Sequence, residues 1–485
     1  MEFEPVIGLE VHAELRTQSK MFCSCAVVDS TTAAPNTTVC PVCSAMPGAL
    51  PVVNQTAVEF GIRVALALEC EVQNTSIFAR KNYFYPDLPK GYQISQYEEP
   101  LAINGKLVIH PSDGEQTIRV RRVHLEEDTG KLTHVEHDGQ SYSLVDLNRA
   151  GVPLLEIVSE PDLHSAEAAR AYGEALRDIV RYLEVNSGDM EKGVIRFEAN
   201  VSVREKGSEK LGTRTEVKNL NSFRALERAI EYEIARQSKI IEAGGTIEQE
   251  TLGWNEARGE TYSQRSKEDA HDYRYFPEPD LPPLIVEDNR IKDIRKNLPE
   301  LPRAKYLRFI KAYGLTEYDA TRLTEEKGVA DYFETVVKSL PSAVPAKTTA
   351  NWMLGDLFAL TNQANVTIGQ LKFKPQALAE LVKMVFEGQI NQSSARQVLN
   401  EMFISGKNAA EIVEARGFRQ VSDESLISNL VRETLAENPK EVESYKAGKA
   451  GVVNFLFGQV MRKAAGKANP QVVRAELDRQ LLSSV

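Results

Sequence analysis

The chain has 485 residues, of which 42% are hydrophobic and 26% are charged, and its formal net charge is −11 at pH 7. This length exceeds what one hydrophobic core supports and predicts about three domains. The acidic balance argues against a surface that is basic throughout, although it permits a local basic patch for nucleic acid. No apolar run reaches the length of a membrane helix, and the first residues lack targeting features. We therefore expect a cytoplasmic protein without a membrane segment.

Residues 6–15 have the pattern of a β-strand, with apolar residues at alternate positions. Because side chains alternate between the two faces of a strand, Glu10, His12 and Glu14 share the polar face, about 7 Å apart. Carboxylates around an imidazole suit Mg²⁺, which prefers oxygen ligands. The alternative is a strand whose polar face meets only water.

A cysteine pattern follows this strand: Cys23-x-Cys25, fourteen intervening residues, then Cys40-x-x-Cys43. Two close pairs joined by a short loop predict a structural zinc site with four thiolate ligands. Disulfides are the weaker alternative, because nothing else in the sequence indicates an oxidising compartment. Cys70 ends an apolar helical run, and we expect it to be a buried thiol of the core.

Residues 81–96 form a segment that combines four aromatic residues with two lysines and two prolines. This mixture suits a rigid loop that stacks a base or ribose and binds phosphate, or a loop whose aromatic rings simply pack together.

Residues 119–131 include three consecutive acids, Glu126, Glu127 and Asp128. Adjacent carboxylates repel unless a cation offsets them, and a divalent ion shared with Glu10 and His12 would do so. The alternative is an exposed acidic turn beside Arg121 and Arg122.

A third polar segment, residues 213–222, leads into a predicted helix. Asn221 or Ser222 suits the helix cap, whereas Arg214 and Lys218 suit contacts with phosphate or with a substrate carboxylate.

Residues 1–294 predict an α+β domain dominated by antiparallel sheet. Short alternating segments cover residues 102–110, 117–124, 141–146 and 194–204, and two helical patterns cover 165–184 and 222–243. Asn104-Gly105 and Asp138-Gly139 are typical of hairpin turns.

Strand patterns almost vanish after residue 300, and we expect an all-α domain over 295–410 and a small helical tail over 411–485. Pro375, Pro439 and Pro470 stand where helices begin, and Gly406 and Gly417 stand where helices end. Residues 441–485 carry seven basic and four acidic side chains. This small excess fits a solvated helical face or a contact with nucleic acid.

Several common sites are missing from the sequence. It contains no Gly-x-x-x-x-Gly-Lys-Ser/Thr loop, no Gly-x-Gly-x-x-Gly fingerprint and no Gly-x-Ser-x-Gly elbow. If four cysteines bind zinc and Cys70 is buried, a cysteine glutaminase is also excluded.

The chain resembles the B subunits of bacterial tRNA-dependent amidotransferases over nearly its whole length. The matching stretches are Ile7-Gly-Leu-Glu-Val-His12, Lys81-Asn-Tyr-Phe-Tyr-Pro-Asp87, Tyr92-Gln-Ile-Ser-Gln96, His124-Leu-Glu-Glu-Asp128, Val145-Asp-Leu-Asn-Arg149, Pro153-Leu-Leu-Glu-Ile-Val-Ser-Glu-Pro161, Lys218-Asn-Leu-Asn-Ser222, Asp272-Tyr-Arg-Tyr-Phe-Pro-Glu-Pro279 and Gly466-Lys-Ala-Asn-Pro470. The zinc prediction rests on the cysteine spacing and not on this resemblance.

The resemblance implies an antiparallel cradle domain with a kinase site, a helical domain and a tail that meets tRNA. It implies a ligase that uses ATP and Mg²⁺ to convert Glu-tRNA(Gln) or Asp-tRNA(Asn) to the amide through a phosphorylated side-chain carboxylate. Ammonia would come from an amidase-fold glutaminase subunit, and a small third subunit would complete a heterotrimer.

The resemblance also assigns roles to single residues. Glu10, His12 and Glu127 would bind the catalytic metal, with Glu126 as the next choice. Lys81 and Tyr83 would contact the nucleotide, and Arg149, Arg214 and Lys218 are weaker candidates for the acceptor end of the tRNA. The tail residues that would touch the tRNA backbone are Lys446, Lys449, Arg462, Lys463 and Lys467.

Two rival functions remain open at this point. One is a non-catalytic scaffold that only binds tRNA, and the other is a metal-dependent hydrolase that works without a glutaminase partner.

Overall fold

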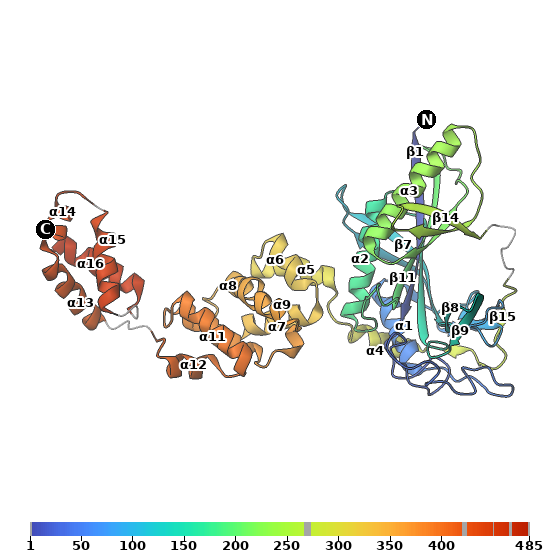
Figure 1. Cartoon of the computed structure of the whole chain (residues 1–485), viewed down its shortest axis with the longest axis horizontal. Helices are drawn as coiled ribbons and strands as arrows, with labels where there is room; N and C mark the ends of the chain where they lie inside the picture. Colours follow the sequence, from blue (N-terminus) through green and yellow to red (C-terminus); the bar gives the residue numbers. More distant parts are fainter. Residues whose placement is uncertain (1, 266–272, 420–423, 450, 465–467, 484–485) are drawn as a thin grey trace. The chain divides into compact units, whose positions relative to one another are not determined.

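A nine-stranded sheet organises the first compact unit of the computed structural model, Met1–Leu301 (Figure 1). The structure describes residues 2–265, 273–419, 424–449, 451–464 and 468–483. The strand order is β14-β13-β12-β11-β1-β10-β7-β6-β2, and all pairs are antiparallel except β12 with β13. The bounds are β1 Phe3–Glu14, β2 Glu71–Val72, β6 Ala102–Ile109, β7 Gln116–Glu127, β10 Pro153–Ser159, β11 Ile195–Glu205, β12 Thr215–Leu220, β13 Thr251–Asn255 and β14 Glu260–Arg265.

The N-terminal strand lies in the middle of this sheet, between β10 and β11. Its apolar side chains Ile7, Leu9 and Val11 are buried in the core, as the alternation predicted, and Glu10 and His12 lie on the opposite face. Three helices pack against the core face: α1 Gln55–Ala67, α2 Ala166–Tyr182 and α3 Phe223–Glu242.

Both long helices predicted in this unit are confirmed, and each begins at a serine cap. The Ser165 hydroxyl accepts a hydrogen bond from the Ala168 amide, and the Ser222 hydroxyl accepts one from the Ala225 amide. Cys70 is buried in the core shortly after α1, as expected.

One of the two predicted hairpin turns is confirmed and the other is wrong. Asp138 and Gly139 both have positive φ and join β8 (Lys131–His137) to β9 (Gln140–Asp146). Asn104-Gly105 instead lies inside β6, and the pairing with β7 continues on both sides of it, with Ile103 opposite Arg122 and Gly105 opposite Val120. A Cβ at Gly105 would lie 2.2 Å from the Cys70 sulfur, so this glycine is required by the close approach of the core and not by a turn.

Two further small sheets pair strands that follow α1 with strands that precede α4 (Asp288–Lys296). One consists of β15 (Phe276–Pro277), β4 (Phe78–Asn82) and β5 (Tyr92–Gln96), and β5 packs over β7. The other pairs β16 (Leu284–Ile285) with β3 (Thr75–Ser76).

Helix α4 (Asp288–Lys296) closes the first unit, and Leu298 and Leu301 still pack against its core. The compact unit thus ends slightly after the predicted boundary at residue 294.

The second unit, Pro302–Val485, is helical throughout its described residues and has two separate hydrophobic cores. The helices around the first of these cores are α5 Pro302–Tyr313, α6 Glu317–Thr324, α7 Lys327–Lys338, α8 Ala346–Asn351, η2 Trp352–Leu357, α9 Phe358–Ala364, η3 Ile368–Gln370, α10 Pro375–Phe386, α11 Gln392–Ser405 and α12 Ala409–Arg416. The last core is built from α13 Glu424–Glu437, α14 Pro439–Lys446, α15 Val452–Lys463 and α16 Pro470–Ser483.

The prolines and glycines mark these helices as expected: α10, α14 and α16 begin at Pro375, Pro439 and Pro470, and Gly406 and Gly417 cap α11 and α12. Helix α12 packs into the earlier core through Ile412 and Val413, so a domain limit at residue 410 stays a prediction. The α+β class, with helices following the sheet domain, is confirmed. No helix among the described residues is long and apolar enough to cross a membrane.

Candidate active site

Five neighbouring strands present acidic or imidazole side chains on the polar face of the large sheet. Strand pairing sets Glu10 of β1 opposite Glu198 of β11, and His12 opposite Glu156 of β10. Next to Glu156, β7 contributes His124 at the paired position. Buried carboxylates at this density need a cation or several hydrogen-bond donors to remain ionised.

The first group on this face consists of His12, Glu126 and Glu156, whose ligand atoms lie within 4.8 Å of one another. The His12 Nε2 is 3.4 Å from Glu156 Oε2 and 3.7 Å from Glu126 Oε1. His124 Nε2 lies 3.1 Å from the same Glu156 oxygen. Within the described residues, the buried Nδ1 atoms of both histidines have no hydrogen-bond partner.

The electrostatics of this group favour a cation. Burial lowers the pKa of His12, but its hydrogen bond to Glu156 and the surrounding carboxylates outweigh this and raise the pKa to about 9. The imidazole therefore carries a proton between the carboxylates, and a divalent ion would take the place of that proton.

The second group consists of Glu10, Glu198 and Glu216, with ligand atoms again within 4.8 Å of one another. Lys218 Nζ lies 2.9 Å from Glu198 Oε2 and 3.4 Å from Glu216 Oε1, and Asn200 donates to Glu10 at 2.9 Å. Burial and the neighbouring carboxylates of Glu156 and Glu198 raise the pKa of Glu10. Because one lysine faces three carboxylates, the group keeps a negative net charge that a further cation would offset.

Glu127 does not join either group. Its carboxylate lies 2.6 Å from the Lys90 ammonium and accepts the Ile94 amide at 3.0 Å. Adjacent residues of a strand point to opposite sides, so Glu126 faces His12 while Glu127 faces Lys90. The predicted ligand set of Glu10, His12 and Glu127 is therefore not brought together, and Glu126 takes the place beside His12.

Lys81 lies beside the first group, on β4. Burial lowers the pKa of Lys81, but the charge of Glu126 and further acidic groups outweigh this and raise the pKa above its usual value. The side chain of Lys81 is therefore an ammonium. Its Nζ is 5.0 Å from the ring centroid of Tyr273, which in turn lies 6.0 Å from the ring of Tyr83. Tyr275 stacks on Tyr97 at 4.3 Å, which adds a flat aromatic surface close by.

The two arginines predicted at the acceptor end differ in their surroundings. Arg149 donates to the carbonyl oxygens of Thr129 and Gly130 at 3.0 and 2.7 Å, and it stabilises the turn after β7. Arg214 is exposed before β12, and within the described chain no contact joins it to the two groups.

Several residues of the site were missed in the sequence, namely Glu156 of the first group, His124 beside it, and Glu198 and Glu216 of the second group. Glu198 and Glu216 occupy alternate polar positions of their strands, which is a usable signal. Glu156 gives none, because every residue of β10 is buried and the strand reads as a nearly continuous apolar run.

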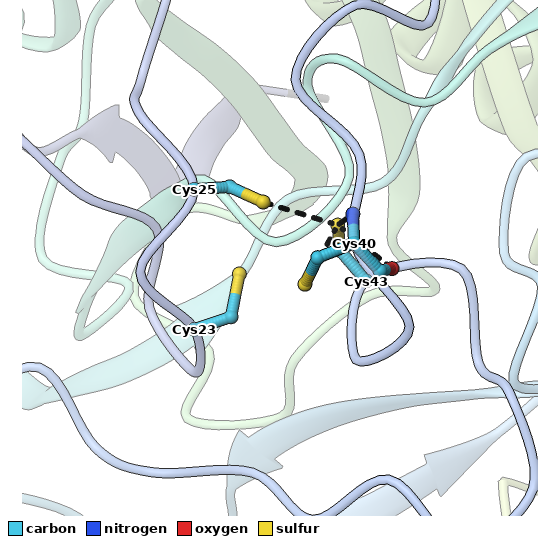
Figure 2. A group of neighbouring side chains, drawn as sticks. All are labelled: Cys23, Cys25, Cys40 and Cys43. Atoms are coloured by element: carbon cyan, nitrogen blue, oxygen red, sulfur yellow. Dashed lines mark hydrogen bonds between the residues drawn. The ribbon is translucent and has the colours of Figure 1, made fainter.

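The four paired cysteines meet in a separate cluster, with sulfurs within 4.8 Å of one another (Figure 2). The sulfur of Cys43 lies 4.0 Å from that of Cys25 and 3.8 Å from that of Cys40. Tetrahedral zinc with Zn–S bonds of about 2.3 Å separates its sulfurs by about 3.8 Å, so the cluster fits a metal such as zinc.

All five cysteines of the chain lie among the described residues, and none of them forms a disulfide. Hydrogen bonding from Cys23 and the nearby Lys20 ammonium lower the pKa of Cys43 to about 4, so this sulfur is a thiolate. A thiolate is the form that binds zinc.

Comparison with known proteins defines the class of the chain. Residues 5–292 match the GatB/GatE catalytic domain, and residues 331–481 match the GatB domain. The chain is 54% identical to the B subunit of the aspartyl/glutamyl-tRNA(Asn/Gln) amidotransferase of Moorella thermoacetica over 481 residues, which are 99% of this chain and 100% of the relative. The same subunits of Persephonella marina and Myxococcus xanthus are 51% and 52% identical, and the matches span 99% of this chain and 100% and 99% of those relatives. The chain belongs to the family of aspartyl/glutamyl-tRNA(Asn/Gln) amidotransferase B subunits.

Proposed function

We propose that this chain activates the side-chain carboxylate of glutamate or aspartate carried by tRNA(Gln) or tRNA(Asn), so that ammonia can convert it to the amide. The observation that supports this most is the pair of acidic groups on one sheet face, with the Lys81 ammonium beside them. Such a site suits a phosphate-rich substrate that arrives with divalent ions.

The chemistry requires activation because a carboxylate is anionic and has no leaving group. In the proposed reaction one carboxylate oxygen attacks the γ-phosphorus of ATP, and ADP leaves. Ammonia then attacks the acyl carbon, phosphate departs with the carboxylate oxygen, and a proton is lost from nitrogen. Phosphoryl transfer depends mainly on positioning and charge neutralisation, which a site of this kind provides.

The residues fit two Mg²⁺ positions. His12, Glu126 and Glu156 would hold one ion, and Glu10, Glu198 and Glu216 would hold the other. Bound Mg²⁺ would neutralise the charge that develops on the transferring phosphoryl group.

The side chains around the two groups would fix the substrates. Lys81 would contact the ATP phosphates, and the rings of Tyr83 and Tyr273 suit stacking against the nucleotide base. Lys218 would act as a neighbouring cation at the second group. Arg149 would act indirectly, by holding the turn that follows Glu127 and Asp128. For Arg214 the exposed loop position supports at most a contact with the incoming tRNA.

The remaining roles fall to other parts of the assembly. A B subunit implies partner subunits and tRNA, and we propose an amidase-fold glutaminase as the ammonia source, with a small third subunit in a heterotrimer.

The helical domain and tail, divided near residue 410, would support tRNA binding. Lys449 and Arg462 are exposed on the tail and suit phosphate contacts, whereas Lys463 pairs with Glu437 at 2.7 Å. Lys467 lies outside the described residues. Substrates of this kind support a cytoplasmic location.

A variant of the carboxylate next to His12 tests this function against a scaffold role. In the reconstituted complex, Glu126→Gln should abolish ATP hydrolysis stimulated by mischarged tRNA while tRNA affinity stays unchanged. Unchanged ATP hydrolysis would favour a scaffold. Turnover with glutamine that needs no glutaminase subunit would favour a stand-alone hydrolase.

A further inference from the structure

Lys20 is a lysine with no exposed surface, next to the cysteine cluster. Its Nζ donates to the carbonyl oxygens of Thr38 at 2.9 Å and Leu147 at 3.1 Å, and it lies 3.6 Å from the Cys43 sulfur. The three acceptors use all three donors of the ammonium. Lys20 therefore joins the loop that carries the second cysteine pair to the segment before β10.

A buried ammonium requires a counter-charge. Moving an unpaired charge out of water costs several kcal/mol or more, and two neutral carbonyl groups do not offset it fully. Within the described residues no carboxylate forms an ion pair with Lys20, and the sulfur of Cys43 is the acceptor that can be anionic. The Cys43 sulfur, in direct contact with Lys20, is thus the group that can supply the missing counter-charge.

We propose that Lys20 is the counter-charge of a four-thiolate metal centre, in which its ammonium hydrogen-bonds to Cys43 and stabilises the bound zinc. Four thiolates around one Zn²⁺ leave a net charge of about −2, and a buried ammonium in direct contact offsets part of it. Hydrogen bonds to metal-bound groups generally orient the ligand and tune its affinity for the metal. Lys20 is a positioning residue in this role, because it acts through Cys43.

Backbone hydrogen bonds that begin next to Lys20 connect the cysteine cluster to the end of β7. The Met21 amide, next in the chain, donates to Gly151 at 2.7 Å, and the Gly151 amide donates to Asp128 at 2.9 Å. Asp128 in turn donates through its own amide to Val152 at 2.8 Å. This series of backbone bonds runs from the cysteine loop to the residues directly after Glu126 and Glu127. Zinc bound against Lys20 would thereby hold the edge of the proposed active site.

Lys20→Met tests the charge, because methionine is unbranched like lysine and has no ammonium. Zinc affinity of the full chain is measured by competition with a chromophoric chelator, and thiol exposure by reaction with a thiol reagent. We expect the zinc dissociation constant to rise by about 10–100-fold, as is typical when a partner of a metal ligand is lost. We also expect the gap in melting temperature between zinc-loaded and zinc-free protein to shrink.

Two further variants separate charge from packing. Lys192→Met removes an exposed lysine that pairs with Asp29 of the same cysteine loop at 3.4 Å, and its zinc affinity should equal that of the unmodified chain. Lys20→Gln keeps a hydrogen-bond donor without the charge, and it should weaken zinc binding as Lys20→Met does. The Gln variant also decides the question if the Met variant does not fold. Unmodified zinc affinity in either Lys20 variant would overturn the proposal.

Discussion

The carboxylate face and the cysteine cluster lie in one domain but are assembled in opposite ways. The cysteine ligands come from one short stretch, residues 23–43, and their spacing alone predicts that they meet. The six ligand positions of the carboxylate face come from five strands spread over residues 10–216. Only the pairing of those strands brings them together. Local spacing thus predicts the cysteine cluster, whereas only the topology of the sheet brings the carboxylates together.

The ligand chemistry of the two regions differs as well. Four thiolates complete a tetrahedral coordination shell and leave no position for a substrate, which fits a structural role. Carboxylates with one imidazole bind a hard ion and leave positions for phosphate oxygens, which fits catalysis. Substitutions in the two regions should therefore have different consequences.

The largest effect is expected at Glu156, which contacts both His12 and His124. Glu156→Gln should lower the rate of tRNA-dependent ATP hydrolysis by at least about 100-fold, because it removes a proposed metal ligand from a preorganised site. Steady-state phosphate release in the reconstituted complex measures this. Glu160→Gln is the matched control, since Glu160 pairs with Arg121 at 2.8 Å outside the acidic groups and should leave the rate unchanged.

Cysteine variants should lower the thermal stability more than they lower the rate of ATP hydrolysis. Cys40→Ser should empty the zinc site, lower the melting temperature and retain measurable ATP hydrolysis below the new melting point. Elemental analysis of protein purified without added metal, together with thermal unfolding, checks this. Rates that collapse in the folded variant to the level of Glu156→Gln would contradict the distinction between the two regions.

Glu233 provides a buried carboxylate that needs no metal. It is fully buried and accepts hydrogen bonds from Arg236 at 2.8 Å and from Thr215 at 3.0 Å. Burial raises the pKa of Glu233, but the hydrogen bonds from Arg236 and Thr261 outweigh this and hold it below its usual value. Glu233→Gln should destabilise the protein by about 2–4 kcal/mol, because Arg236 loses its nearest anionic partner.

The Glu233 carboxylate also makes the free energy of unfolding depend on pH. Because the pKa of Glu233 is lower in the folded state than in the unfolded state, its contribution is complete above about pH 4.5 and is lost as the pH falls through the folded-state value. Denaturant unfolding of both proteins between neutral and acidic pH should therefore show the difference narrowing in acid. A difference that stays constant with pH would refute this account of Glu233.

The smallest effect is expected on the tail. Replacing Lys449 and Arg462 together by alanine should weaken tRNA binding by about 3–10-fold and reduce its salt dependence, because both residues are exposed and suit phosphate contacts. Filter binding at several salt concentrations measures this. Unchanged affinity and an unchanged salt slope would remove these residues from the tRNA contact.

The sequence predicted where helices and turns lie better than it predicted which distant segments contact one another. Ser165 and Ser222 marked helix starts, and Asp138-Gly139 marked a turn, because caps and turns depend on a few adjacent residues. Asn104-Gly105 has the same composition as a turn, but it lies inside a paired strand, where the buried Cys70 leaves room only for glycine at position 105.

The candidate site shows the same limit. Alternation placed Glu10 and His12 on one face correctly, but it could not decide between Glu126 and Glu127. That choice depends on which side chains of β7 lie on the same face of the sheet as Glu10 and His12. The pairing of β7 with β10, and of β10 with β1, sets this. Glu156 stayed hidden because β10 reads as a nearly continuous apolar run.

The most direct test follows the oxygen of the substrate carboxylate. Glutamate labelled with ¹⁸O in its side-chain carboxylate is attached to tRNA(Gln), and the complex is supplied with ATP, Mg²⁺ and ammonium. Activation by phosphorylation predicts that one labelled oxygen appears in the released phosphate and the other stays in the amide. Glu156→Gln should release almost no labelled phosphate. Amide formation with unlabelled phosphate would show that the carboxylate is not phosphorylated and would contradict the proposed mechanism.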